Sequence, residues 1–266
     1  MIRVYERKAK TVMHRTRLPE ADWGINYYHG CTHGCIYCYL RFLCRWRRGE
    51  AWGEFVDVKV NAPELVFRES WKKRGTAILC TGGDPYQPVE GKYQLTREVL
   101  KNLNKNLKLC VLTKSDMITR DIDLFKEFRE CELGLTITTM DMGVKKVFEP
   151  FSSPPHKRVD ALKWLKEEGF HTYVFIGPIL PYLTDLEEIL REVSPFVDVF
   201  MFEDLNLGPC RREVLSAIKK HFPELDEKYR SLSKDFWLRK EKEIKMLSKG
   251  FNKPVRIFFK HTGSWN

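Results

Sequence analysis

The chain has 266 residues, of which 46 are Lys or Arg and 36 are Asp or Glu, giving a net charge of +10 at neutral pH. Its hydrophobic share of 43% is ordinary for a folded protein and can fill the core of one large domain. No run approaches the ~20 apolar residues of a membrane span, and the first residues lack the apolar core of a signal peptide. We therefore expect a cytoplasmic protein that does not associate with membranes. Its eight cysteines are expected to be thiols or metal ligands rather than disulfides.

Strand-like and helix-like segments alternate along the chain. About six short apolar runs, bounded by turn residues, predict strands over 24–29, 76–81, 107–113, 134–139, 171–176 and 197–202. Helical patterns predict helices over 62–74, 95–103, 120–131, 159–168 and 186–193, with Thr119 as the N-cap of the third. Apolar strands separated by helices favour a parallel sheet with crossover helices. We therefore expect an α/β fold, namely a partial (β/α)6 barrel of TIM type.

The two ends of the chain differ from this repeating part. Residues 1–22 are basic and lack clear periodicity, and we expect them to form an N-terminal arm. The barrel is expected over 23–208. Residues 209–266 predict a small basic helical extension, with a helix near 235–247 and a final strand over 254–259.

Three cysteines carry the strongest chemical signal. Cys31, Cys35 and Cys38 lie within eight residues of one another, in a run that also contains glycine, threonine and histidine. Soft thiolate ligands suit the iron of an iron–sulfur cluster. A cubane cluster has four irons, so three cysteines leave one iron without a protein ligand. Such an open position is where bound metals do chemistry.

A zinc site, a ferredoxin-type cluster and simple packing all fit these cysteines less well. A structural zinc site normally pairs two short Cys-x-x-Cys or His units, and the chain has no second Cys-x-x-Cys. His33 lies too close to the cysteines in sequence to complete a tetrahedron easily. A ferredoxin pattern needs further cysteines at its own spacing, which Cys44 does not provide. Free cysteines are also common in protein cores, but the polar neighbours argue against simple packing.

The pattern Cys-x-x-x-Cys-x-aromatic-Cys, with Tyr37 as the aromatic residue, resembles the signature of the radical S-adenosylmethionine (SAM) enzymes. The longer run 30–40 resembles the spore photoproduct lyase-like branch of that superfamily. The resemblance implies a [4Fe-4S] cluster on the three cysteines and SAM as the second cofactor. Reductive cleavage of SAM would then give a 5′-deoxyadenosyl radical that abstracts hydrogen from a substrate. A flavodoxin- or ferredoxin-type protein would supply the electron.

Polar residues follow the ends of two predicted strands, where the active site of such a barrel is expected. Gly82, Gly83 and Asp84 follow the strand over 76–81, and paired glycines let the backbone approach a ligand closely. The same residues are also good turn formers. The resemblance implies that they bind the amino group of SAM.

Lys114 directly follows the strand over 107–113, where it can pair with a carboxylate or remain an ordinary solvated lysine. The resemblance implies that it faces the SAM carboxylate. Thr136 and Thr138 alternate along the next strand and therefore share a face. They are candidates for hydrogen bonds to the SAM ribose, although threonine is also common in strands for its β propensity.

Cys80 stands immediately before the glycine turn. In the spore photoproduct lyase-like branch, a cysteine close to this position returns a hydrogen atom to the product radical, so the resemblance implies a catalytic role. This chain has one extra residue, Gly-Gly in place of a single serine, which leaves the alignment open by one position. The alternative is a small packing residue at the end of a strand, as expected for Cys110.

The positive charge is concentrated in particular segments. Residues 209–266 contain 15 Lys and Arg against 7 Asp and Glu, and Arg41, Arg45, Arg47 and Arg48 follow the cysteines. A basic surface with interspersed aromatic residues is typical of nucleic-acid binding. A lysine- and glutamate-rich surface of a heat-stable protein would look similar. The sequence therefore predicts a radical SAM enzyme with nucleic acid as a candidate substrate. The alternative is a non-catalytic iron–sulfur protein that binds nucleic acid or senses redox state.

Overall fold

The computed structural model describes residues 2–44 and 49–261. Its main feature is a curved eight-stranded sheet with the strand order β11-β10-β9-β8-β7-β6-β3-β2. All neighbouring pairs from β3 to β11 are parallel, and only β2 runs antiparallel, at one edge. The strands are β2 (Met13–Arg15), β3 (Trp23–Ile25), β6 (Thr76–Leu79), β7 (Lys108–Thr113), β8 (Glu130–Thr136), β9 (His171–Ile176), β10 (Val199–Glu203) and β11 (Val255–Phe258). The edge strands β2 and β11 are not paired with each other, so the structure confirms a partial barrel that is not closed.

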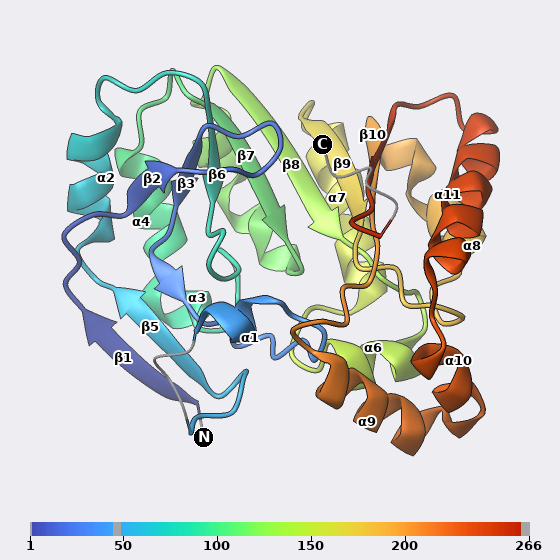
Figure 1. The fold of residues 1–266 in the computed structure, drawn as a ribbon. Helices are drawn as coiled ribbons and strands as arrows, with labels where there is room; N and C mark the ends of the chain where they lie inside the picture. Colours follow the sequence, from blue (N-terminus) through green and yellow to red (C-terminus); the bar gives the residue numbers. More distant parts are fainter. Residues whose placement is uncertain (1, 45–48, 262–266) are drawn as a thin grey trace.

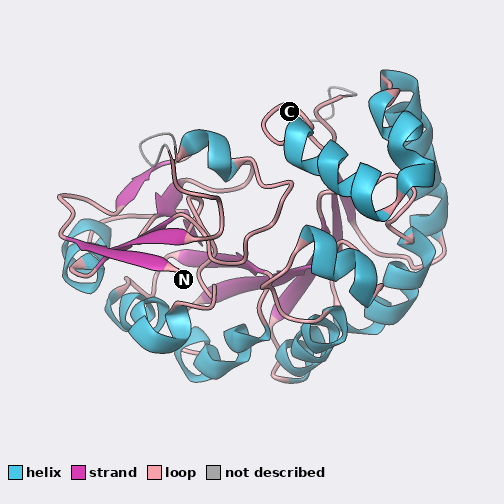
Figure 2. Cartoon of the chain, turned by 90° about the horizontal axis from the view of Figure 1, so that it is seen from below, coloured by secondary structure: helices cyan, strands magenta, loops and turns pink. Residues whose placement is uncertain are grey.

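Helices cover the outer face of this sheet, as Figure 2 shows. The helices that connect the strands are α2 (Ala62–Ser70), α3 (Glu90–Tyr93), α4 (Leu95–Asn102), α5 (Ile122–Phe125), α6 (Met142–Phe148), α7 (Pro155–Glu167) and α8 (Leu186–Val193). Of these, α6 lies beside α9 (Arg211–His221) below the strand ends and not over the outer face (Figure 1). Strand residues alternate between the two faces. Leu109, Val111, Leu133 and Leu135 face the helices in the main core. A smaller group, built around Tyr173, Val199 and Met201 with Cys110 and Phe175, lines the inner face.

A second, smaller sheet adjoins the barrel, with β5 (Phe55–Lys59) between β1 (Arg3–Arg7) and β4 (Tyr28–His29) (Figure 1). The predicted strand over 24–29 is therefore divided. Its first part, β3, belongs to the large sheet, and its second part, β4, belongs to the small one. The segment expected as an N-terminal arm contributes β1 to the small sheet and β2 to the large one. The short helix α1 (Leu40–Leu43) follows β4.

The helix predicted over 120–131 is wrong. A 3₁₀ helix, η2 (Asp116–Asp121), begins earlier, and the hydroxyl of Ser115 rather than Thr119 accepts a backbone N–H at its start. Only the four residues of α5 follow it, because Glu130 and Cys131 already belong to β8. There they pair with Lys108 and Leu109 of β7. Pairing with β7 outweighs the local helical preference of this segment.

The last part of the chain packs at the β10 edge of the sheet. It contains α9 (Arg211–His221), α10 (Asp226–Arg230), α11 (Lys234–Lys249) and β11, which extends the sheet beside β10. Short 3₁₀ helices, η3 (Ser194–Phe196) and η4 (Pro223–Leu225), precede β10 and α10. Buried Asp204 accepts the backbone N–H groups of Lys260 and His261, which fixes the segment after β11. None of the helices in the described residues is long and apolar enough to cross a membrane.

Candidate active site

The three cysteines lie on the loop between β4 and α1, at the carboxyl ends of the barrel strands. The loop turns sharply, because Gly30 and Gly34 have φ angles of +87° and +67°. A Cβ atom at Gly30 would lie 2.8 Å from the carbonyl oxygen of Phe55, so the loop can pass β5 only with glycine here. Cys31 and Cys35 are buried and Cys38 is half-buried.

Burial raises the pKa of all three thiols, that of Cys35 to about 12. The negative charges of Asp84, Cys35 and Cys38 also raise the pKa of Cys31. Among the described residues, no three His, Cys, Asp or Glu side chains converge as the ligands of one metal ion do. A cluster binds each cysteine through a different iron, and its ligands are therefore farther apart. Three thiols on one loop are the donor set that an iron–sulfur cluster requires.

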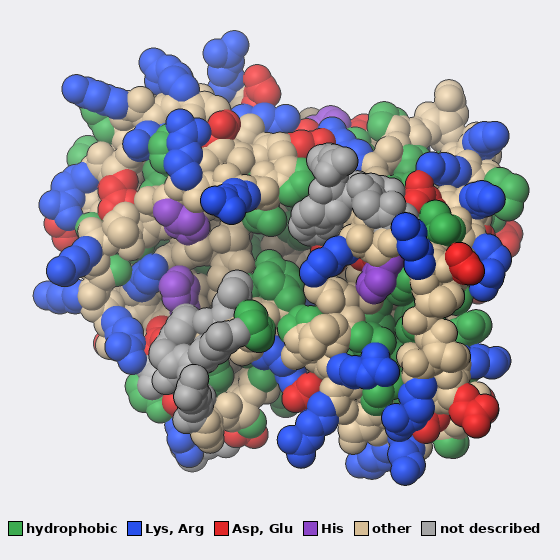
Figure 3. Space-filling model, in the orientation of Figure 1, with side chains coloured by type: hydrophobic (Ala, Val, Ile, Leu, Met, Phe, Trp, Pro, Cys, Tyr) green, Lys and Arg blue, Asp and Glu red, His purple; other side chains and the backbone are tan. Residues whose placement is uncertain are grey.

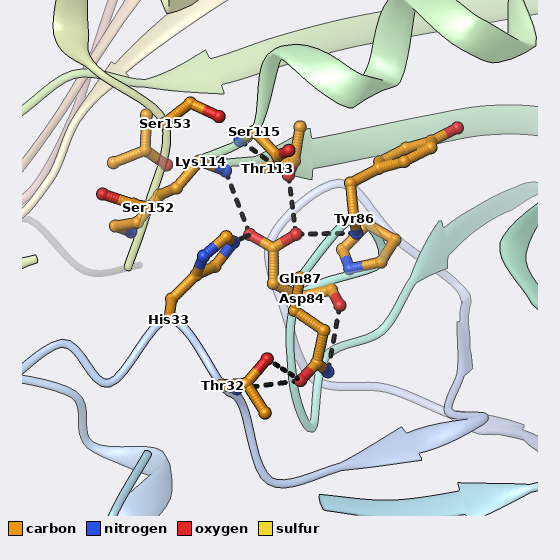
Figure 4. Close-up of polar contacts among 12 residues, drawn as sticks. Thr32, His33, Asp84, Tyr86, Gln87, Thr113, Lys114, Ser115, Ser152 and Ser153 are labelled. Carbon is orange, nitrogen blue, oxygen red and sulfur yellow. Dashed lines mark hydrogen bonds and ion pairs between the residues drawn. The ribbon is translucent and has the colours of Figure 1, made fainter. Parts of the chain in front are cut away.

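Asp84 anchors this loop to the barrel (Figure 4). One carboxylate oxygen accepts the Thr113 hydroxyl at 2.6 Å and the backbone N–H of Tyr86 at 2.8 Å. The other accepts the backbone N–H of Lys114 at 3.0 Å and faces His33 Nε2 at 3.3 Å. Burial opposes ionisation, but His33 and these hydrogen bonds outweigh it and lower the pKa of Asp84 to about 2.

The other ring nitrogen of His33 lies 3.2 Å from the carbonyl oxygen of Phe151, so the ring bridges two loops. Gln87, in the turn after β6, binds the same cysteine loop. Its side-chain oxygen accepts the N–H and hydroxyl of Thr32, and its amide donates to the carbonyl of Gly30 (Figure 4). A pocket of about 500 Å³ opens beside these contacts, between His33, Tyr86, Ser115 and Phe151.

A second buried carboxylate, Glu149, holds the loop from the opposite side. One of its oxygens accepts the hydroxyls of Tyr37 and Thr138, and the other binds the guanidinium of Arg158 at 2.5 Å. Burial opposes its charge, but Arg158 and Lys114 outweigh it and lower the pKa of Glu149 to about 2.

The sequence analysis missed Glu149 and Arg158. One signal was available, because Glu149 stands among apolar residues, where an unpaired carboxylate would be costly.

Lys114 extends from the end of β7 into the space between the two anchors. Its ammonium lies 5.7 Å from the centre of the Tyr37 ring and makes no hydrogen bond or ion pair with the described residues. Burial acts against its charge, but Cys35 and Glu149 outweigh this effect and raise the pKa of Lys114. Its positive charge is therefore available to an anionic ligand beside the cysteines.

Glu203, at the carboxyl end of β10, is a further acidic group in this space that the sequence analysis missed. Burial raises its pKa to about 7, although the charge of Lys114 acts in the opposite direction. Its charge also contributes to the raised pKa of Cys38, after the larger effect of burial. The available signal was an acidic residue directly after a predicted strand.

The remaining predicted residues occupy different surroundings. Gly82 and Gly83 form the turn after β6, and a Cβ at Gly83 would lie 2.9 Å from the carbonyl oxygen of Gly30. Thr136 ends β8, and its carbonyl accepts Arg158, whereas the Thr138 hydroxyl donates to Glu149 at 2.9 Å. Cys80 is buried and has a φ of +51°, and its thiol lies against Tyr27. Burial raises the pKa of Cys80 to about 12, and its hydrogen-donor role stays a prediction.

An open parallel α/β barrel with a three-cysteine loop at the carboxyl ends of its strands defines one class of enzyme. Residues 25–193 match the radical SAM superfamily, more than half of the chain, and the protein therefore belongs to this superfamily. Membership implies a [4Fe-4S] cluster, SAM and an external reductant, in agreement with the cysteine spacing.

The relatives with similar sequences are uncharacterized. A protein of Methanocaldococcus jannaschii is 43% identical over 223 residues, which cover 84% of this chain and 85% of the relative. A protein of Acidianus two-tailed virus is 29% identical over 77% of this chain and 75% of its own length. The descriptions of these relatives carry no information on the substrate.

Solved structures with a similar fold have well under a quarter of their residues in common with this chain. Spore photoproduct lyase complexed with dinucleoside spore photoproduct has a TM-score of 0.65 at 17% identity, covering 97% of this chain and 82% of the lyase. Streptococcus suis SuiB bound to the precursor peptide SuiA has a TM-score of 0.56 at 14% identity, covering 88% and 47%. Both likenesses confirm the fold.

Proposed function

We propose that this protein is a radical SAM enzyme whose cluster is held by Cys31, Cys35 and Cys38. When bound, a [4Fe-4S] cluster supplies the electron for reductive cleavage of SAM to methionine and a 5′-deoxyadenosyl radical, which abstracts hydrogen from the substrate. The observation that carries the proposal is the position of the three cysteines on one loop, beside a Lys114 ammonium that has no ion-pair partner in the described part of the chain.

The other residues bind and orient SAM. The Lys114 ammonium pairs with the SAM carboxylate, and the backbone of Gly82 and Gly83 receives its amino group. Asp84 already accepts three hydrogen bonds and faces His33, so we assign it a positioning role at this turn. Thr136 and Thr138 offer hydroxyl groups to the ribose.

The substrate and the electron donor are further parts of this proposal. A basic chain with +10 net charge favours an anionic substrate, such as nucleic acid, and an acidic reductant of the flavodoxin or ferredoxin type. Arg41 pairs with Glu213 at 2.6 Å, and its charge is therefore already neutralised in part. Arg45, Arg47 and Arg48 lie outside the described residues.

The deciding experiment is anaerobic reconstitution with iron and sulfide, reduction with dithionite and an assay for 5′-deoxyadenosine after addition of SAM. The wild type should form deoxyadenosine, whereas Cys35→Ala should not. Cys131→Ala, which removes a half-buried cysteine far along the chain from the loop, is the matched control and should retain activity. A fully loaded and reduced wild-type cluster that forms no deoxyadenosine, with or without nucleic acid, would contradict the proposal and favour a non-catalytic cluster.

A further inference from the structure

We propose that His14, on the inner face of the barrel, and Lys59, at the end of β5 in the adjoining small sheet, form a phosphate-binding site beside the Gly82 turn. This inference rests on the proposed function, because the site would hold a phosphate group of the substrate next to SAM. Figure 3 shows the hollow on this face of the molecule, with histidine, lysine and arginine side chains around it. The chain's net charge of +10 would attract an anion toward this hollow.

The strand register places His14 on the inner face. His14 of β2 pairs with Gly24 of β3, Gly24 pairs with Ile78 of β6, and Ile78 pairs with Cys110 of β7. Residues in register share a face of the sheet, and Cys110 packs against the inner group of side chains. Gly24 leaves room for the imidazole, because a Cβ there would lie only 2.9 Å from His14 Nε2.

Asn26 fixes which nitrogen of His14 can bind a ligand. Its side-chain oxygen accepts the backbone N–H of Gly82 at 2.8 Å and the hydroxyl of Thr81 at 3.2 Å. Its amide nitrogen therefore faces His14 Nε2, at 3.2 Å, and donates to it. Because the Asn26 amide occupies Nε2, Nδ1 of this exposed histidine is the ring nitrogen that remains for a ligand.

Lys59 brings a positive charge to the same asparagine. Its ammonium donates to the main-chain carbonyl of Asn26 at 2.7 Å, which leaves two N–H groups for a ligand. It forms no ion pair with the described residues. The nearest carboxylates are already bound, since Arg7 holds Asp57 at 2.7 Å and the N–H of Met13 holds Glu69 at 2.8 Å. An anion at this point would therefore neutralise a half-buried charge.

The opposite edge of the sheet offers an apolar surface to the rest of the substrate. Phe175 of β9 and Phe258 of β11 lie with ring centres 6.5 Å apart, both half-buried on the inner face. Arg256 of β11 pairs with Glu20, just before β3, so the two edges approach each other across the opening. A molecule with a phosphate group and a planar apolar group fits this combination, whether it is a nucleic-acid strand or a small phosphorylated compound.

The test measures binding of two probes by the reconstituted protein. One probe is a fluorescein-labelled oligothymidylate of about twelve nucleotides, followed by anisotropy at several salt concentrations. The other is thymidine 5′-monophosphate, followed by calorimetry. The variants are Lys59→Met, which keeps the apolar stem, His14→Ala, and the charge-retaining Lys59→Arg. Lys163→Met, on the outer helix α7, is the charge-matched control.

If a strand supplies the phosphate, Lys59→Met should weaken oligothymidylate binding by roughly fivefold at low salt. It should also reduce the slope of log K against log salt by about 0.7, as expected for one lost phosphate contact to a single strand. Lys59→Arg should restore the slope, and Lys163→Met should not change it. If a small compound supplies the phosphate, the same pattern of affinities should appear with thymidine monophosphate alone.

Equal affinities and slopes for wild type, Lys59→Met and His14→Ala with both probes would overturn the inference. Deoxyadenosine formation is measured on the same samples. If Lys59→Met still cleaves SAM but binds both probes like the wild type, only the phosphate site fails. If no sample cleaves SAM although Lys59→Met impairs probe binding, only the proposed function fails.

Discussion

Two buried carboxylates hold the cysteine loop, and they do so in different ways. Asp84 distributes its charge over two backbone N–H groups, one hydroxyl and His33. Glu149 depends mainly on one buried guanidinium, that of Arg158, with two hydroxyls on its other oxygen. One loop is therefore fixed both by a carboxylate that shares its charge among several partners and by a carboxylate that depends on one buried ion pair.

The two arrangements should respond differently to mutation. Removing one partner of a buried ion pair leaves an uncompensated charge, which is strongly destabilising. A carboxylate that shares several hydrogen-bond donors loses less when it becomes an amide, because one carbonyl oxygen still accepts hydrogen bonds. The following predictions test this difference, beginning with the largest effect.

Arg158→Met should have the largest effect, because it leaves the Glu149 carboxylate buried without its cation. We expect a loss of about 3–5 kcal/mol in the free energy of unfolding, measured by urea denaturation. Lys163→Met, which removes an exposed cation from the same helix, should cost less than about 0.5 kcal/mol. A loss below about 1 kcal/mol for Arg158→Met would show that Glu149 does not depend on the ion pair.

Acid should have the second largest effect, because protonation of Glu149 removes its contribution to the free energy of unfolding. Its pKa is lowered in the folded protein from 4.5 to about 2, so its contribution is complete above pH 5 and is lost as the pH falls toward 2. This loss amounts to about 3 kcal/mol. Urea denaturation at stepped pH values should show a flatter decline for Glu149→Gln than for the wild type. If the free energy of unfolding fell equally with pH in the two proteins, the lowered pKa of Glu149 would be contradicted.

Asp84→Asn should have a smaller effect, about 1–3 kcal/mol, because the amide keeps the shape and part of the hydrogen bonding. The cluster of the reconstituted protein should also be lost faster to a chelator, as followed by its visible absorbance. Asp123→Asn is the control, since Asp123 is exposed and pairs with Arg97 at the surface. Equal effects of the two substitutions would mean that Asp84 does not anchor the loop.

Tyr37→Phe should have the smallest effect, about 1 kcal/mol, because it removes one of several donors to Glu149. Tyr93→Phe, which removes an exposed hydroxyl bonded to Glu6, should cost less. The comparison is made by urea denaturation of both variants. A cost for Tyr37→Phe as large as that of Arg158→Met would place the strength of the Glu149 anchor in the hydroxyl instead of the ion pair.

Features that depend on local pattern were predictable from the order of residues. The spacing of Cys31, Cys35 and Cys38 indicated the superfamily, which the family match confirms. The predicted strand over 171–176 is β9 and the predicted helix over 186–193 is α8, because a short apolar run and a strong helical stripe each define one structure locally. The Gly82–Gly83 turn after β6 was also readable, because glycine pairs mark turns.

Contacts between residues far apart in the chain follow from the folded arrangement and not from local pattern. Glu149 and Tyr37 are 112 residues apart, and no local pattern relates them. Residues 130 and 131 became strand because β7 offered them a pairing partner, and the backbone at Cys80 turned its thiol against Tyr27. Buried charges and edge pairings depend on the register of the whole sheet, and that register exists only once the chain has folded.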